Sequence, residues 1–94
     1  MVKQEIIEFS ESLNNSPASL NEAQRILDFC LDLMIALNEK ELLRKFRNFD
    51  LRLSMNAFSF IIEEDSSQIE EVFWNNAIKE LKFDIEGFLR NFEP

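Results

Sequence analysis

The strongest constraint on the fold of this chain is a regular stripe of large apolar residues in its last third. The stripe steps by four, three, four, three and four positions, and it consists of Trp74, Ile78, Leu81, Ile85, Phe88 and Phe92. Such spacing places all of these side chains on one side of an α-helix. We therefore predict a long helix that opens with the capping-box sequence Ser67-Gln68-Ile69-Glu70. Gly87 lies inside this helix and predicts either a closely packed neighbour or a bend.

Two earlier segments also show the helical period. The first is expected from about Val2 to Leu13, and its apolar stripe is Val2, Ile6, Phe9 and Leu13. The second begins at a capping box of Ser19 and Glu22, and its stripe is Ala23, Ile26, Leu27, Cys30, Leu33, Met34 and Leu37. Because three more apolar residues widen that stripe, this helix is expected to lie centrally among the others: Phe29, Leu31 and Ile35.

The segment between residues 50 and 63 fits two patterns. Alternating apolar residues at its start are typical of a strand: Leu51, Leu53 and Met55. A single polar strip at helical spacing favours a helix instead: Arg52, Asn56, Ser59 and Glu63. We favour the helix, opened by a cap at Asn38 and Glu39 and either continuous to Glu64 or bent near residues 48–50. A two-stranded hairpin is the alternative.

Together these patterns predict an all-α fold. A chain of 94 residues forms one domain, residues 1–94, and a single Gly with two Pro disfavours the many tight turns of all-β proteins. The prediction is an antiparallel bundle of about four helices, with an α+β fold carrying a short hairpin near residues 50–63 as the alternative. Four Phe at the stripe edges are expected to complete a wide core, and any that stay exposed would mark an interface: Phe29, Phe49, Phe60 and Phe83.

The composition excludes several kinds of chemistry. The chain has no His and no Tyr, and its single Cys and single Gly provide neither a thiolate metal site nor a phosphate-binding loop. We therefore expect no catalytic residues, no cofactor and no metal, and a protein that is not an enzyme. Cys30 is expected to be a buried free thiol in a reducing, cytoplasmic compartment. We expect no signal peptide, and no stretch of about 20 apolar residues that would span a membrane occurs in this sequence.

Charge is unevenly distributed along the chain, whose formal net charge is −8. Five acids lie within nine residues: Glu63, Glu64, Asp65, Glu70 and Glu71. They represent either a solvated loop with acids at a helix start, or a docking patch for a basic protein surface. The segment Lys40–Arg52 holds half of the ten basic residues. We interpret it as an internal counterweight to the acidic helices, with a phosphate- or acid-binding patch as the alternative.

These properties favour a protein that works by binding another protein. The leading hypothesis is an inhibitor, such as an immunity protein, an antitoxin or an anti-defence protein, that blocks the surface of a partner carrying basic groups. The alternative is a homo-oligomeric structural subunit, for example a homodimer, or a chaperone-like bundle that shields an apolar segment. The acidic balance argues against nucleic acid as a partner. The capping boxes and stripes are generic to helical proteins and identify no particular family.

Overall fold

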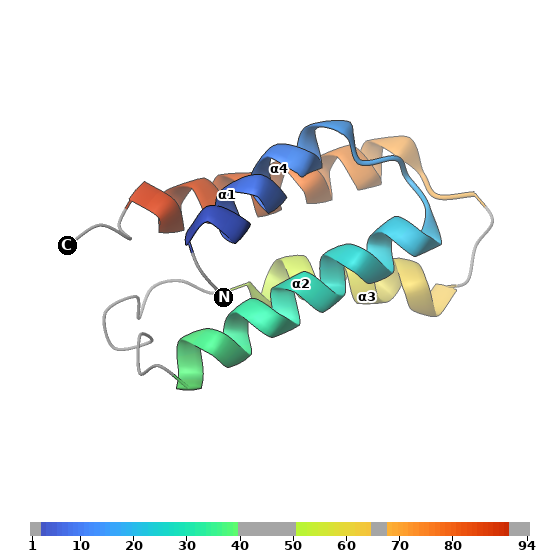
Figure 1. The fold of residues 1–94 in the computed structure, drawn as a ribbon. Coiled ribbons are helices and arrows are strands. Elements are labelled where there is room, and N and C mark those ends of the chain that lie inside the picture. Colours follow the sequence, from blue (N-terminus) through green and yellow to red (C-terminus); the bar gives the residue numbers. More distant parts are fainter. Residues whose placement is uncertain (1–2, 40–50, 65–67, 91–94) are drawn as a thin grey trace.

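The structure is a computed structural model, and it describes residues 3–39, 51–64 and 68–90. These residues are helical apart from short connections (Figure 1). Four α-helices and one short 3-10 helix are present there: α1 (Lys3–Ser12), η1 (Leu13–Asn15), α2 (Leu20–Glu39), α3 (Arg52–Glu64) and α4 (Glu71–Arg90). The predicted all-α bundle is confirmed. The hairpin alternative is wrong, because residues 52–64 form α3 and no strand occurs within the described ranges.

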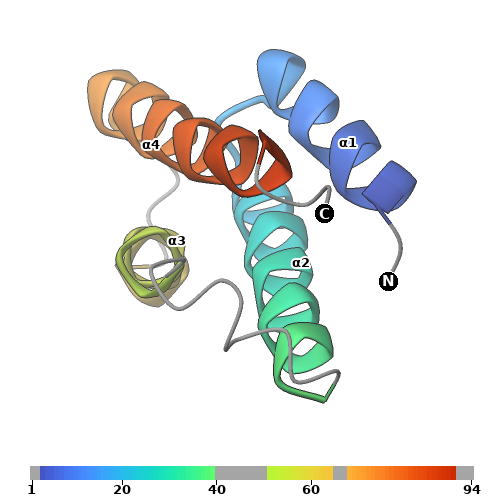
Figure 2. The same ribbon diagram turned by 90° about the vertical axis from the view of Figure 1, so that its left-hand side faces the viewer.

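The helices pack in two layers. Helix α1 lies against α4, α2 lies against α3, and α3 also contacts α4. Figure 1 shows α1 and α4 side by side above α2 and α3, with the chain running in opposite directions along the two helices of each layer. Figure 2, which looks nearly along α3, shows the same separation between the layers. The contact between α3 and α4 places these two helices along one side of the molecule.

The stripe of α4 supplies much of the core. Trp74, Leu81, Ile85 and Phe88 are at most 2% exposed, Ala77 is also buried, and Ile78 is half-buried. Phe92 lies outside the described residues. On the opposing helix, Ile6 and Phe9 of α1 are buried, as is Leu13 of η1. The stripes predicted from spacing are therefore the faces along which α1 and α4 meet.

Helix α2 buries the centre of its stripe but is not enclosed on all sides. The buried members are Ala23, Ile26, Cys30, Leu33 and Leu37. Burial raises the pKa of the Cys30 thiol to about 12, so the thiol stays protonated and poorly reactive at neutral pH. Leu31 and Ile35, in contrast, are 41% and 54% exposed. The prediction of a central helix is wrong for this side of α2, because no described element covers it.

The connection between α1 and α2 is held by a network of polar side chains. Ser19 caps α2, since its Oγ accepts a hydrogen bond from the backbone N–H of Glu22 at 3.1 Å. The Glu22 carboxylate accepts from Ser16 Oγ at 2.9 Å and from the Nε of Arg25 at 3.0 and 3.1 Å. The hydrogen bond from Arg25 lowers the pKa of Glu22, with a smaller effect of Ser16 in the same direction. The Ser19 cap was predicted from the sequence, whereas the contact between Arg25 and Glu22 was not.

Trp74 joins this connection to two other helices. Its indole Nε1 donates a hydrogen bond to the backbone carbonyl of Ser16 at 3.2 Å. Its ring meets Phe58 of α3 edge-on, with ring centroids 5.5 Å apart and an interplanar angle of 85°. Trp74 is thus a core residue with a satisfied polar atom, as its place in the stripe predicted, and not a surface anchor.

Two sequence predictions about helix ends need correction. Helix α4 begins at Glu71 rather than Gln68, because the backbone N–H of Trp74 donates to the Glu70 carbonyl at 3.0 Å and makes Glu70 the capping position. Asn38 and Glu39 belong to the last turn of α2, so they do not open a third helix. Any helix through residues 40–50 lies outside the described residues, as does Ser67.

The expected close neighbour at Gly87 is also absent from the described part of the structure. Helix α4 continues through Gly87 to Arg90. A Cβ placed on Gly87 would meet only the guanidinium of Arg90 at 3.6 Å, which is an ordinary van der Waals contact. Close packing therefore does not require glycine here.

Candidate protein-binding surface

Four of the five predicted acidic residues lie at one end of the α3–α4 pair. Glu63 and Glu64 end α3, Glu70 caps α4 and Glu71 begins it, and all four side chains are exposed. Asp65 lies outside the described residues. We call these four residues the acidic end. Within the described ranges, none of the four forms an ion pair with another side chain.

The helix dipoles explain the presence of acids at only two of the four positions of the acidic end. Glu70 and Glu71 lie at the positive N-terminus of α4, where a carboxylate stabilises a helix by about 0.3–1 kcal/mol. Glu63 and Glu64 lie at the negative C-terminus of α3, where a carboxylate is unfavourable by a similar amount, and no basic residue occupies that last turn. Solvation of a helix start therefore does not explain why Glu63 and Glu64 are acidic.

An aromatic patch adjoins the acidic end, and the sequence analysis did not identify it. It consists of Phe60, Val72 and Phe73, which are 53%, 64% and 39% exposed. The rings of Phe60 and Phe73 tilt against each other across the two helices, with centroids 6.1 Å apart. The available signal was that Val72 and Phe73 are apolar yet lie off the stripe of α4.

Helical spacing brings the acids close to these rings. Glu63 and Glu64 follow Phe60 by three and four residues in α3, so both lie one turn from its ring on the same helix face, and Glu70 and Glu71 precede Phe73 by three and two residues at the start of α4. The result is an apolar centre bordered by carboxylates. Protein-binding surfaces commonly show this arrangement, with aromatic anchors inside and a polar rim outside.

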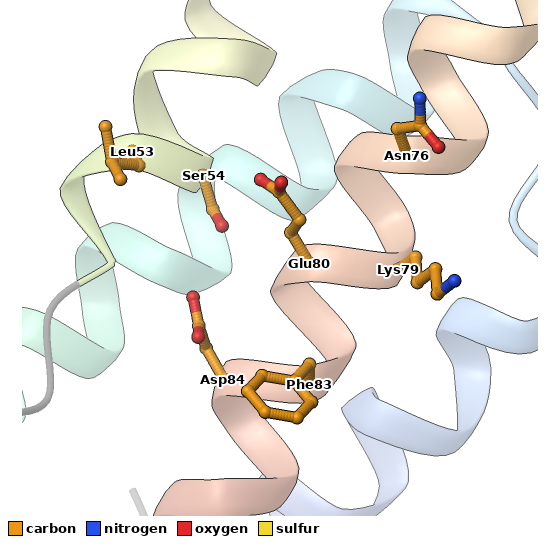
Figure 3. A pocket seen from close by; sticks show the side chains of 7 residues that line it. All are labelled: Leu53, Ser54, Asn76, Lys79, Glu80, Phe83 and Asp84. Atoms are coloured by element: carbon orange, nitrogen blue, oxygen red, sulfur yellow. The ribbon is translucent and has the colours of Figure 1, made fainter.

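An open groove lies between the same two helices (Figure 3). Its volume is about 610 Å³, and it is lined by Leu53, Ser54, Asn76, Lys79, Glu80, Phe83 and Asp84. Leu53 and Phe83 stand 81% and 69% exposed at its borders. Figure 3 shows Glu80 and Asp84 pointing from α4 toward α3, whereas Lys79 points to the other side of α4. We call this feature the α3–α4 groove.

The expectation that the edge Phe residues complete the core holds for one of the three that the structure describes. Phe29 is half-buried and stacks on Phe9, with ring centroids 3.8 Å apart and an interplanar angle of 8°. Phe60 and Phe83 are exposed, so the expectation is wrong for both, and Phe49 lies outside the described residues. Scattered exposed apolar residues are ordinary on a protein surface, but here they gather on two adjacent helices.

The basic stretch predicted from sequence is described only at its end. Arg52 opens α3 and is exposed, while Lys40, Arg44, Lys45 and Arg47 lie outside the described residues. No group of three or more His, Cys, Asp or Glu side chains in the described ranges is arranged to hold a metal ion. The described helices also include none with the length and apolar content required to cross a membrane.

Comparison with known proteins identifies no relative. No protein-family model matches the chain, and no significant match was found among curated proteins or solved structures.

Proposed function

We propose that this protein is a binding module that covers the surface of a partner protein with its acidic end and aromatic patch. The observation that carries the proposal is the exposed Phe60–Phe73 pair, with Glu63 and Glu64 of the acidic end one helical turn from Phe60. Aromatic rings provide large contact areas at small entropic cost and often dominate binding energy. The surrounding carboxylates favour a basic partner surface and accelerate encounter with it.

In its concrete form, the module is an inhibitor of the immunity-protein, antitoxin or anti-defence kind, acting in a reducing compartment. The chain lacks His and Tyr, and its only thiol is buried and protonated. Its surface therefore offers shape and charge, and neither an imidazole nor a reactive thiol. A partner would be inhibited because its functional surface is occupied, not because it is chemically altered.

The test is capture of partners from the native host with tagged protein, washed at low and high salt. The variant Phe60→Ser/Phe73→Ser removes the aromatic anchors, and Leu31→Ser/Ile35→Ser removes equally exposed apolar residues from α2 as a matched control. We expect the wild type and the α2 variant to retain one stoichiometric basic partner, and the Phe variant to lose it. Equal capture by all three proteins would show that the aromatic patch is not the binding surface.

A second pair of variants tests the charges. Replacing Glu63, Glu64, Glu70 and Glu71 by Gln removes four charges from the acidic end, and the control removes four exposed charges elsewhere by changing Glu5, Glu8, Glu11 and Asp32 to their amides. We expect the first variant to slow association and to weaken its salt dependence, while the control retains both. Equal effects would mean that only the net charge of the molecule matters.

A homo-oligomeric subunit is the second candidate function, and the exposed side of α2 favours it. Leu31 and Ile35 lie one turn apart and provide an apolar surface far along the chain from the aromatic patch. Light scattering of the eluted protein distinguishes the candidates. An oligomer that Leu31→Ser/Ile35→Ser converts to a monomer would support this function, and a monomeric wild type would exclude it.

A further inference from the structure

We propose that the α3–α4 groove binds a basic amphipathic helix presented by the partner. This inference rests on the proposed binding function and adds the chemistry of the segment that is bound. It starts from the shape of the groove, since two adjacent packed helices leave a furrow along which a third helix can pack at 8–10 Å. The volume of about 610 Å³ accommodates several side chains.

Exposed apolar residues occur at both ends of this furrow. On α3, Leu53 and Phe60 are seven residues apart, which corresponds to about 10 Å along the helix axis. On α4, Phe73 and Phe83 are ten residues apart, or about 15 Å. A bound helix with apolar residues at positions i, i+3 or i+4, and i+7 spans about 10 Å, as on α3, and a further apolar residue at i+10 extends its stripe to about 15 Å, as on α4.

The charges along the furrow favour a cationic occupant. Glu80 points across the groove toward α3 and forms no ion pair with another described residue. The four carboxylates of the acidic end lie at the far end of the same helix pair. Asp84 adds a further acid on α4. Among the described residues at the groove, the basic side chains are Arg52 at the start of α3 and Lys79, which points away from α3. Lys and Arg on the flanks of a bound helix would therefore face carboxylates on both helices.

The same charges disfavour a second copy of this chain as the occupant. In a two-fold symmetric dimer the same surface contributes from both subunits. Two copies joined about a two-fold axis at the centre of this groove would bring their Glu80 residues toward one another, and like charges opposed across an interface disfavour association. The groove therefore fits an unlike partner better than itself.

The test uses designed peptides of 15 residues and fluorescence anisotropy at low salt. The probe has Leu at helical spacing and Lys elsewhere, one control has the same composition shuffled so that no apolar face forms, and a second has Glu in place of Lys. We expect the probe to bind the wild-type protein and both controls to bind at least roughly tenfold more weakly. A shuffled peptide that binds as tightly as the probe would overturn the proposal, because it would reduce binding to charge alone.

Variants of the protein test whether the probe binds in the α3–α4 groove. Leu53→Ser/Phe83→Ser changes only exposed side chains, so the fold is expected to persist, as circular dichroism can verify. We expect this variant to bind the probe about tenfold more weakly and Leu31→Ser/Ile35→Ser to bind it like the wild type. Glu80→Gln should weaken binding severalfold and reduce its salt dependence. Unchanged binding by Leu53→Ser/Phe83→Ser, or conversion of a wild-type dimer to a monomer by it, would refute the proposal.

Failure here is distinguishable from failure of the proposed function. If the Phe60→Ser/Phe73→Ser variant loses a captured partner while the probe does not bind the wild type, the binding function stands and the helical occupant is wrong. If the probe binds through Leu53 and Phe83 but no partner depends on the aromatic patch, the groove is a peptide site and the proposed surface is wrong.

Discussion

Single side chains decide how the connection between α1 and α2 is fixed, and Glu22 is the main example. Its carboxylate holds Ser16 and Arg25 together, and Arg25 also donates to Ser12 Oγ at 3.3 Å and lies over the Phe9 ring at 5.3 Å. One acid therefore connects the end of α1 with the first turns of α2. The backbone carbonyl of Ser16 also accepts the hydrogen bond from the Trp74 indole.

Glu22→Gln should lower the free energy of unfolding by about 1 kcal/mol at pH 7, because a charge-assisted hydrogen bond becomes a neutral one. The folded state holds the pKa of Glu22 below its ordinary value of 4.5. This stabilisation is therefore complete above pH 4.5 and is lost as the pH falls through the lower folded-state pKa. Urea unfolding of both proteins at pH 7 and pH 3 measures the difference, which should shrink at pH 3.

Glu11→Gln is the control for this prediction, since Glu11 is exposed in α1 and its change should alter stability by no more than a few tenths of a kcal/mol. A Glu22→Gln difference that stays constant from pH 7 to pH 3 would contradict the ionic role of this carboxylate.

Whole helices were predictable from sequence because period alone defines which side of a helix is apolar. Ile6, Trp74 and Ile85 are buried as their spacing requires. The period does not show which residues of a wide apolar arc are covered by another helix. The exposure of Phe60 and Phe83, and therefore the groove, could not be predicted from the sequence. The start of α4 was misplaced because Ser and Glu at capping-box spacing recur by chance in a segment rich in both.

Gly87→Ala should stabilise α4. The position is helical and has room for a Cβ, so alanine removes backbone entropy from the unfolded chain without a clash. We expect about 1 kcal/mol of added stability, which raises the midpoint of thermal unfolding by roughly 4–8 °C in a domain of this size. Differential scanning calorimetry measures the shift.

Asn75→Ala, at an exposed position of the same helix, shows how much of that shift is ordinary helix propensity. A lower midpoint for Gly87→Ala would mean that glycine is needed at this position for packing.

The molecule as a whole carries excess negative charge. Its formal net charge is −8, and two of its ion pairs, Arg25–Glu22 and Lys82–Glu86, each connect residues of a single helix turn. Mutual repulsion among the acids should destabilise the compact state at low ionic strength. We expect the midpoint of thermal unfolding to rise by a few degrees as NaCl increases from about 0.01 to 0.3 M, where the Debye length falls from about 30 Å to below 10 Å.

The four-amide variant of the acidic end should show a smaller rise, because it has already lost part of the repulsion. A midpoint that falls with added NaCl would show that attractive pairs, not repulsion, dominate the electrostatics of this fold.

The packing of α1 on α4 has a consequence for how the protein is made. During translation, α1 is synthesised well before α4, which packs against it. Ser16, whose carbonyl accepts the hydrogen bond from the Trp74 indole, precedes Trp74 by 58 residues. At 5–20 residues per second this delay lasts roughly 3–12 seconds. During that interval the apolar side of α1 has emerged without the helix that covers it, and it can meet chaperones or other nascent chains. The bundle can close only after α4 has left the exit tunnel.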